Sequence, residues 1–265
     1  MIHDNSPVLA PQRREQIRCL VRDEGVVRVQ DLLQSLGVSV ATIRRDLEIL
    51  EEEGKVQRVH GGAITMEGRL EEALFDDKKI RANKEKSLIA EEAYKLIGKG
   101  DSLYLDGGST TLGLARMLKD RTDLTLVTNS LRAAAELADA GPKVILIGGE
   151  LRRISQTIVG PLSTGVLSQL RVDKAFMGTM GFCLTHGLTT TDPNEAFVKN
   201  LVAKHAGQVI LLADSGKVEK VSFARVSDWD DVDDLVSDRN LPKPFAETLR
   251  KRGVKVRIAS SNNKN

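Results

Sequence analysis

A pair of short amphipathic segments joined by a tight turn, close to the N-terminus, constrains this chain most. In the first segment apolar residues recur with helical spacing, at Val29, Leu32, Leu33 and Leu36. This spacing predicts a single apolar stripe on a short helix. Gly37 follows directly and is typical of the left-handed residue that ends a helix. The chain must therefore turn at Gly37, and the apolar stripe of this helix must be buried against other elements.

A second helix is predicted directly after the turn. Ser39 can cap it by accepting a backbone N–H, and its apolar stripe consists of Ile43, Leu47 and Leu50. Thr42, Arg44 and Arg45 lie off that stripe, within the first two turns. Paired arginines on a helix are usually a solvated face, but at the start of a recognition helix such residues reach base edges and phosphates. The pattern predicts a DNA-binding helix-turn-helix.

The residues after Gly54 alternate between apolar and polar side chains and then reach a glycine pair, Gly61-Gly62. This alternation predicts a β-wing beside the recognition helix, with Lys55 and Arg58 available for phosphates. The complete expected DNA-binding set is Ser39, Thr42, Arg44, Arg45, Lys55, Arg58 and His60.

This part of the chain resembles the winged N-terminal domain of the DeoR-type bacterial transcription regulators. The segments that match are Gly37-Val38-Ser39, Thr42-Ile43-Arg44-Arg45-Asp46-Leu47, Leu50-Glu51 and His60-Gly61-Gly62-Ala63. The resemblance implies a winged helix-turn-helix that binds double-stranded operator DNA.

Charge indicates how such a module would bind. The whole chain carries a net charge of +2, and residues 11–66 contain nine Lys/Arg and nine Asp/Glu, so the module is formally neutral. Because most non-specific DNA affinity comes from neutralised phosphates, a neutral module should bind weakly by itself. We therefore expect a homo-oligomer, with dimer and tetramer both open.

Other residue types exclude several classes of protein. The two cysteines, Cys19 and Cys183, do not make a disulfide framework and favour a cytoplasmic location. The four histidines lack partners at metal spacing, so we expect no metal and no cofactor. No apolar run approaches the length of a membrane span, and residues 1–10 lack the apolar stretch of a signal peptide.

The pattern changes after residue 80. Short apolar runs such as 102–105, 124–127, 144–147, 175–177 and 209–212 alternate with helical segments, which predicts a largely parallel sheet covered on both faces. The expected organisation is a tail at 1–10, a winged helix-turn-helix at 11–66, a linker at 67–80, an α/β effector domain at 81–259 and a second tail at 260–265.

Polar loops follow the predicted strands, where ligands of open α/β sheets bind. Asp106-Gly107-Gly108-Ser109-Thr110-Thr111 leads into a helix and could hold a phosphate, although it is neither a Walker loop nor a dinucleotide fingerprint. Other polar groups are expected in the loops at 128–130, 148–150, 187–195 and 213–217, and around the end of the strand at 175–177, in the stretch 173–181. Each could be an ordinary turn, but together they suit a phosphorylated polyol.

These loops resemble the C-terminal sensor domain of the DeoR family, whose fold is similar to that of ribose-phosphate isomerases and CoA transferases. The resemblance implies a repressor of carbohydrate metabolism whose operator affinity depends on a phosphorylated sugar or polyol. The expected effector-binding residues are Asp106, Gly107, Gly108, Ser109, Thr110, Thr111, Thr128, Asn129, Ser130, Gly149, Gly178, Asp192, Glu195 and Lys217.

Two alternatives remain. The first is a sugar-phosphate isomerase-like enzyme with an added DNA-binding domain, in which Glu195 would be the general base. The isomerase-type Asp-Gly-Ala-Asp-Glu run is missing, and the nearest stretch is Asp173-Lys174-Ala175-Phe176, so no catalytic residue is expected. The second is an architectural DNA binder, which would not need the many ligand-type loops of the larger domain.

Overall fold

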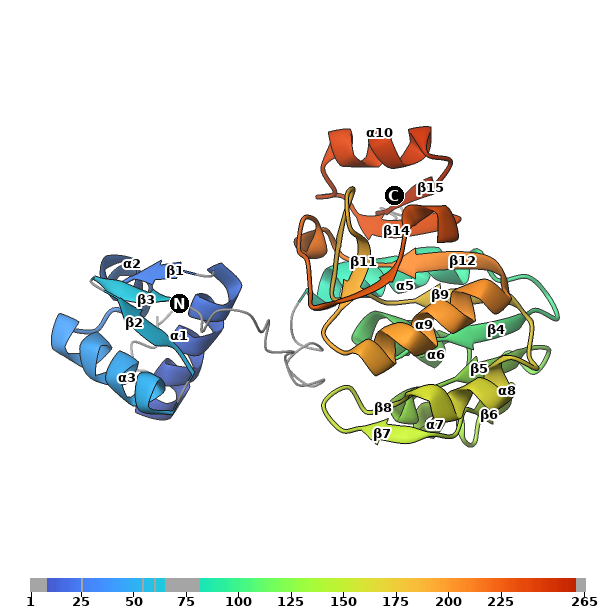
Figure 1. Ribbon diagram of the computed structural model, residues 1–265, viewed down its shortest axis with the longest axis horizontal. Coiled ribbons are helices and arrows are strands. Elements are labelled where there is room, and N and C mark those ends of the chain that lie inside the picture. Colours follow the sequence, from blue (N-terminus) through green and yellow to red (C-terminus); the bar gives the residue numbers. More distant parts are fainter. Residues whose placement is uncertain (1–8, 25, 54, 60, 65–81, 261–265) are drawn as a thin grey trace, which may run out of the picture. The chain divides into compact units, whose positions relative to one another are not determined.

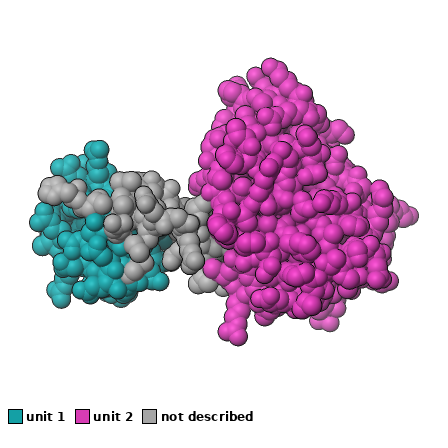
Figure 2. Space-filling model, in the orientation of Figure 1, with its two compact units in different colours: residues 1–71 teal, residues 72–265 magenta. Residues whose placement is uncertain are grey.

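A computed structural model describes residues 9–24, 26–53, 55–59, 61–64 and 82–260 of the chain. The chain divides into two compact units, Met1–Glu71 and Glu72–Asn265 (Figure 2). The linker predicted at 67–80 lies outside the described residues, as do nearly all residues of the two predicted tails.

The described residues of the N-terminal unit form three helices and a small antiparallel sheet (Figure 1). The helices are α1 (Ala10–Glu24), α2 (Val29–Leu36) and α3 (Val40–Glu52). The strands are β1 (Val26–Arg28), β2 (Gln57–Val59) and β3 (Gly62–Ile64), in the order β1-β3-β2. The predicted winged helix-turn-helix is confirmed, while β1 was not predicted from the sequence.

Local chemistry explains the turn and the wing. Gly37 has a φ of 64° and donates its N–H to the Leu33 carbonyl at 3.0 Å, so it closes α2. The Ser39 hydroxyl accepts the Thr42 N–H at 3.2 Å and caps α3. A Cβ on Gly62 would lie 2.2 Å from the Val27 carbonyl oxygen, so only glycine lets β3 approach β1 this closely.

The C-terminal unit is built on one seven-stranded sheet, in the order β15-β14-β12-β9-β4-β5-β6. Every neighbouring pair in it is parallel, which confirms the predicted α/β class with a mainly parallel sheet. Its strands are β4 (Ser102–Leu105), β5 (Thr125–Thr128), β6 (Lys143–Leu146), β9 (Val172–Met177), β12 (Ala206–Leu212), β14 (Asp234–Asp238) and β15 (Lys255–Ala259).

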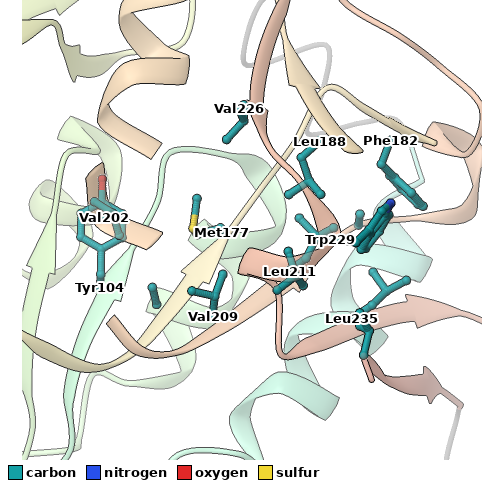
Figure 3. Close-up of a cluster of buried hydrophobic side chains, with 14 of the residues drawn as sticks. Tyr104, Met177, Phe182, Leu188, Val202, Val209, Leu211, Val226, Trp229 and Leu235 are labelled. Carbon is teal, nitrogen blue, oxygen red and sulfur yellow. The ribbon is translucent and has the colours of Figure 1, made fainter. Parts of the chain in front are cut away.

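Helices cover both faces of this sheet (Figure 1). The helices α5 (Asn83–Tyr94), α6 (Ser109–Met117) and α7 (Leu131–Leu137) share one buried cluster with Leu103 and Leu105 of β4. The other face holds α8 (Thr164–Leu167), α9 (Pro193–His205) and α10 (Lys243–Lys251), which share a second buried cluster with Tyr104. Tyr104 lies between the two leucines in the sequence of β4, and Figure 3 shows it in this second cluster. Alternate strand residues therefore supply two separate cores.

Several short elements were not predicted. They are the hairpin of β7 (Glu150–Arg152) and β8 (Thr157–Val159), the antiparallel sheet of β10 (Gly181–Cys183), β11 (Gly187–Thr190) and β13 (Ala224–Ser227), and the 3-10 turns η1 (Pro161–Ser163), η2 (Ser215–Lys217) and η3 (Trp229–Asp231). The expectation of a polar loop over 187–190 was wrong. Those residues form a buried strand, because protein groups bind their threonine hydroxyls, as Gly181 O does for Thr189 at 3.1 Å.

One helix end also differs from its prediction. The helical spacing of Ile89, Ala93, Leu96 and Ile97 predicts a helix that ends at Gly98, but α5 ends at Tyr94. The N–H groups of Leu96 and Ile97 bond carbonyls three residues back, at 3.0 and 3.1 Å, so the chain tightens into turns there.

Candidate functional site

The start of α3 carries the predicted DNA-contacting residues on its open side. Arg44 and Arg45 are exposed and Thr42 is half-buried. The opposite side of α3 holds the core residues Ile43, Leu47 and Leu50, which are at most 3% exposed. The helix therefore presents two cations that packing leaves free to meet a nucleic acid.

The acidic residue of the Arg44-Arg45-Asp46 run has a different role. Asp46 is buried and accepts a hydrogen bond from the guanidinium Nε of Arg13 at 2.6 Å. Arg13 is itself buried on α1. This ion pair fastens α3 to α1, so Asp46 positions the recognition helix.

The wing is attached to the second half of α3 through Arg58. Its guanidinium lies 2.9 Å from Glu48, and its backbone N–H donates to Glu51 at 2.8 Å. Arg58 would have to leave Glu48 to hold a phosphate with the same nitrogen. Lys55 is exposed beside the wing, Ser39 caps α3, and His60 lies outside the described residues.

A buried charged cluster occupies the carboxyl edge of the seven-stranded sheet. Asp106, directly after β4, accepts a hydrogen bond from the Lys199 ammonium and another from the Gly178 N–H at 2.9 Å. Lys199 also donates to the Gly178 carbonyl at 3.1 Å and lies 3.4 Å from Glu195. The side chains of Asp106 and Lys199 are only 1% and 2% exposed. Residues from β4, β9 and α9 thus meet at one point.

Burial and the neighbouring carboxylates set the protonation of Lys199 and of Tyr104, which precedes Asp106 by two residues. Burial opposes the charge on Lys199, but the carboxylates of Asp106 and Glu195 outweigh it and raise the pKa of Lys199 above its ordinary value. Burial, followed by the charges of the same two carboxylates, raises the pKa of Tyr104 well above its ordinary value. Near neutral pH, Lys199 is therefore a cation and Tyr104 a neutral phenol that can donate a hydrogen bond.

Three polar atoms near this edge are buried without a hydrogen-bond partner among the described residues: Tyr104 Oη, Asp106 Oδ1 and Asn129 Oδ1. A buried polar atom without a partner is costly, and native proteins contain few of them. One hydroxyl donor and two acceptors thus remain available, next to a buried ammonium.

The β7–β8 hairpin covers the Gly107 loop. A Cβ on Gly107 would lie 2.0 Å from the Thr157 methyl, so the missing side chain permits this contact. The Ile158 N–H donates to the Asn129 carbonyl at 2.7 Å, and the Asn129 amide donates back to the Ile158 carbonyl at 3.1 Å. At the turn end of the hairpin, Arg152 lies 3.3 Å from Asp192, which caps α9 by accepting the Glu195 N–H.

Family comparisons match both units. The DeoR-like helix-turn-helix domain matches residues 13–69, and the DeoR C-terminal sensor domain matches residues 81–239. This chain belongs to the DeoR family of transcriptional regulators. It is accordingly a regulator, and the isomerase-like enzyme considered from the sequence is not supported.

Individual members of the DeoR family match along almost their whole length. The transcriptional regulator GlpR of Haloferax volcanii and GolR of Listeria innocua are each 34% identical over 249 residues, covering 94% of this chain and 98% of the relative. The transcriptional repressor AccR of Agrobacterium fabrum is 32% identical, covering 91% of this chain and 96% of its own.

Solved structures with similar chains include ribose 5-phosphate isomerase A of Methanocaldococcus jannaschii, at 20% identity and a TM-score of 0.39, covering 52% of this chain and 55% of that one. Translation initiation factor eIF-2B of Pyrococcus horikoshii is 13% identical with a TM-score of 0.44, covering 85% and 86%.

Most other expected effector residues of this DeoR-family chain have structural contacts. The Thr128 hydroxyl donates to the Leu105 carbonyl at 2.6 Å, Ser130 caps α7, and the Thr111 hydroxyl donates to the Gly108 carbonyl at 3.0 Å. A Cβ on Gly149 would lie 2.8 Å from the Ile158 side chain. Ser109 and Thr110 form the first turn of α6, while Lys217 donates to the Thr179 carbonyl at 2.8 Å. Their role in effector binding stays a prediction.

Three residues at or beside the cluster are absent from the expected effector set: Tyr104, Arg152 and Lys199. Lys199 follows Glu195 by one helical turn, which could have indicated an ion pair. Tyr104 lies inside an apolar run and Arg152 in an unpredicted hairpin, so no local pattern marked either one.

A separate groove of about 800 Å³ lies between α6 and α7, and none of the expected effector residues lines it. Its cations are paired, with Arg116 at 3.2 Å and Lys119 at 2.8 Å from Glu136. Within the described ranges, no three His, Cys, Asp or Glu residues group as a metal site. None of the helices in those ranges has the length and apolar character needed to cross a bilayer.

Proposed function

We propose that this protein is a repressor of a carbohydrate-metabolism operon, and that a phosphorylated sugar or polyol bound at the carboxyl edge of the sheet lowers its operator affinity. The single observation that carries the effector proposal is the set of three unpartnered buried atoms, Tyr104 Oη, Asp106 Oδ1 and Asn129 Oδ1, beside the Lys199 ammonium. The name of the relative AccR, a transcriptional repressor, supports the sign of the regulation.

The chemistry of the edge suits such a ligand. The hydroxyls of a polyol could donate to the free oxygens of Asp106 and Asn129 and accept from Tyr104. A phosphate would meet the backbone N–H groups at the start of α6, after Gly107 and Gly108, where the helix dipole favours an anion. Lys199 would remain paired with Asp106, so it would act as a fixed positive charge within the site.

The DNA half of the proposal rests on Arg44 and Arg45, which are exposed at the start of α3. Bidentate contacts from such arginines to guanine, or single contacts to phosphate, would supply affinity and specificity. Effector and operator binding must be linked by a coupling free energy, and about 1–3 kcal/mol would change operator affinity about 5–150-fold.

The test combines ligand screening with one conservative variant. The full chain is screened by thermal shift against phosphorylated sugars and polyols, and compounds that raise its melting temperature are titrated against DNA from its own genomic neighbourhood. Tyr104→Phe, which removes only a hydroxyl, should weaken the selected compound about 2–12-fold, because a hydrogen bond contributes about 0.5–1.5 kcal/mol.

The matched control is Tyr94→Phe, which changes the chain's other tyrosine, on α5. It should leave effector affinity unchanged, and both variants should bind operator like the wild type. The proposal would be contradicted if no phosphorylated sugar or polyol altered operator affinity, or if Tyr104→Phe bound the effector as tightly as the wild type.

A further inference from the structure

An exposed apolar surface surrounds the N-terminal end of α9. Its central side chains are Leu162 of η1, Phe197 of α9 and Phe223 just before β13, which are 78%, 42% and 81% exposed. Leu151, Val166 and Val221, on the adjoining segments, are 41–46% exposed. We call these six residues the α9 apolar surface.

Backbone contacts bring the segments of this surface together. The Gly160 N–H donates to the Asn194 carbonyl at 3.4 Å, which places η1 beside the first turn of α9. Thr190 pairs with Ala224 in the small sheet, and its hydroxyl donates to Glu195 at 3.1 Å. Phe223, which precedes Ala224 in the chain, therefore lies near the first turn of α9. The helix α8, which carries Val166, packs beside α9 (Figure 1).

Among the described residues, exposed phenylalanine side chains are confined to this surface. Aromatic residues are only 3% of the chain. Of the five phenylalanines that the structure describes, Phe176, Phe182 and Phe245 are at most 5% exposed. The other two, Phe197 and Phe223, both lie on the α9 apolar surface. Single exposed apolar residues need no explanation, but a contiguous group of them marks an interaction site.

We propose that the α9 apolar surface binds the same surface of a second copy of this chain. A two-fold interface sets a surface against a second copy of itself, and apolar side chains are complementary to one another wherever the axis lies. Two arginines beside this surface are already paired with carboxylates of the same copy. Arg152 lies 3.3 Å from Asp192, and Arg225 lies 2.7 Å from Asp228. Nothing in these pairs would repel a second copy.

The DNA-binding unit gives a second reason to expect that the partner of the α9 apolar surface is another copy of this chain. This step rests on the proposed function. Residues 11–66 are formally neutral and contain one recognition helix, so useful operator affinity requires two units acting together. The surface borders the proposed effector site, because Asp192 and Glu195 belong to the same end of α9. An assembly through α9 would thus place each effector site beside the interface between copies.

Sedimentation velocity tests this interface, because it measures the mass of the full chain in solution. The measurement is made at micromolar concentration and without DNA. One copy has a mass of 29.0 kDa, and the wild type should sediment as a dimer or a larger even assembly. The double variant Phe197→Ser/Phe223→Ser should reduce the assembly mass at least twofold. The matched control Leu146→Ser/Ile258→Ser changes apolar residues that are 45% and 39% exposed on edge strands, and should assemble like the wild type.

The single variant Phe223→Ser is the alternative if the double variant does not fold. It changes a side chain that is 81% exposed, so it should keep the fold and still weaken the association. A monomeric wild type, a variant that assembles like the wild type, or a control that dissociates equally would each overturn the interface. Because the readout needs no DNA and no effector, a protein that assembles through this surface but binds no operator would refute only the proposed function.

Discussion

The two units place their polar side chains of interest in opposite environments. In the N-terminal unit, Arg44 and Arg45 are exposed on a helix whose other side forms the core. In the C-terminal unit, Asp106, Glu195 and Lys199 are buried and paired with one another. A surface that reads DNA can be changed with little effect on folding. A buried charged cluster supports the fold as well as any ligand it binds, so a change there should affect both.

The largest expected effect comes from breaking the buried cluster. Lys199→Met leaves Asp106 buried without its cation and leaves Glu195 only the Arg152 guanidinium at 3.9 Å, and removing one partner of a buried ion pair costs about 3–5 kcal/mol. Urea unfolding of the C-terminal unit should show this loss. Lys204→Met, at an exposed position on the same helix, is the control and should change stability by less than about 0.5 kcal/mol. If Lys199→Met were as stable as the wild type, the buried ion pairs of the cluster would not stabilise the fold.

The opposite behaviour is expected for the recognition helix. Arg44→Ala should lower operator affinity about 5–150-fold, because a good base or phosphate contact contributes about 1–3 kcal/mol, while the melting temperature stays unchanged. Fluorescence anisotropy at two salt concentrations measures it. Arg171→Ala removes an exposed arginine from the other unit and should leave affinity unchanged. Wild-type affinity in Arg44→Ala would place the DNA contact elsewhere.

These regions also differ in how far the sequence predicts them. Helical spacing, Gly37 and Ser39 are local signals, and they predicted α2, α3 and the cap between them. The seven parallel strands were visible as apolar runs. The contacts of Lys199 with Asp106 join residues 93 positions apart, and no local pattern reports such a pairing. Likewise, β11 was taken for a loop, because the Thr189 hydroxyl accepts the Ser222 N–H from 33 positions away, a contact that no local pattern reports.

A smaller effect distinguishes capping from DNA contact at Ser39. Ser39→Ala removes the acceptor for the Thr42 N–H and should destabilise the N-terminal unit by about 1 kcal/mol. Ser39→Asp restores a cap and should recover stability, but its negative charge near DNA should weaken operator binding. Thermal unfolding and anisotropy on the same samples separate the two roles. Recovery of both properties by Ser39→Asp would mean that Ser39 acts only as a cap.

The smallest effect concerns an exposed carboxylate that joins β9 to β4. The Ser102 hydroxyl and the Ser102 N–H donate to Asp173 at 2.6 and 2.8 Å, and these bonds lower the pKa of Asp173 below its ordinary value. A lowered pKa means that the folded state holds the proton more weakly than the unfolded state. Its stabilising contribution is therefore complete above the ordinary carboxyl pKa, about 3.9, and is lost as the pH falls below it.

Asp173→Asn should consequently lower the melting temperature of the C-terminal unit by about 1–2 °C at pH 7, since exposed interactions of this kind contribute little. The difference from the wild type should shrink as the pH falls towards 3. Asp139→Asn, at another exposed aspartate, serves as the control and should show no such trend. A difference that stayed constant with pH would show that the charge of Asp173 is not what holds these strands together.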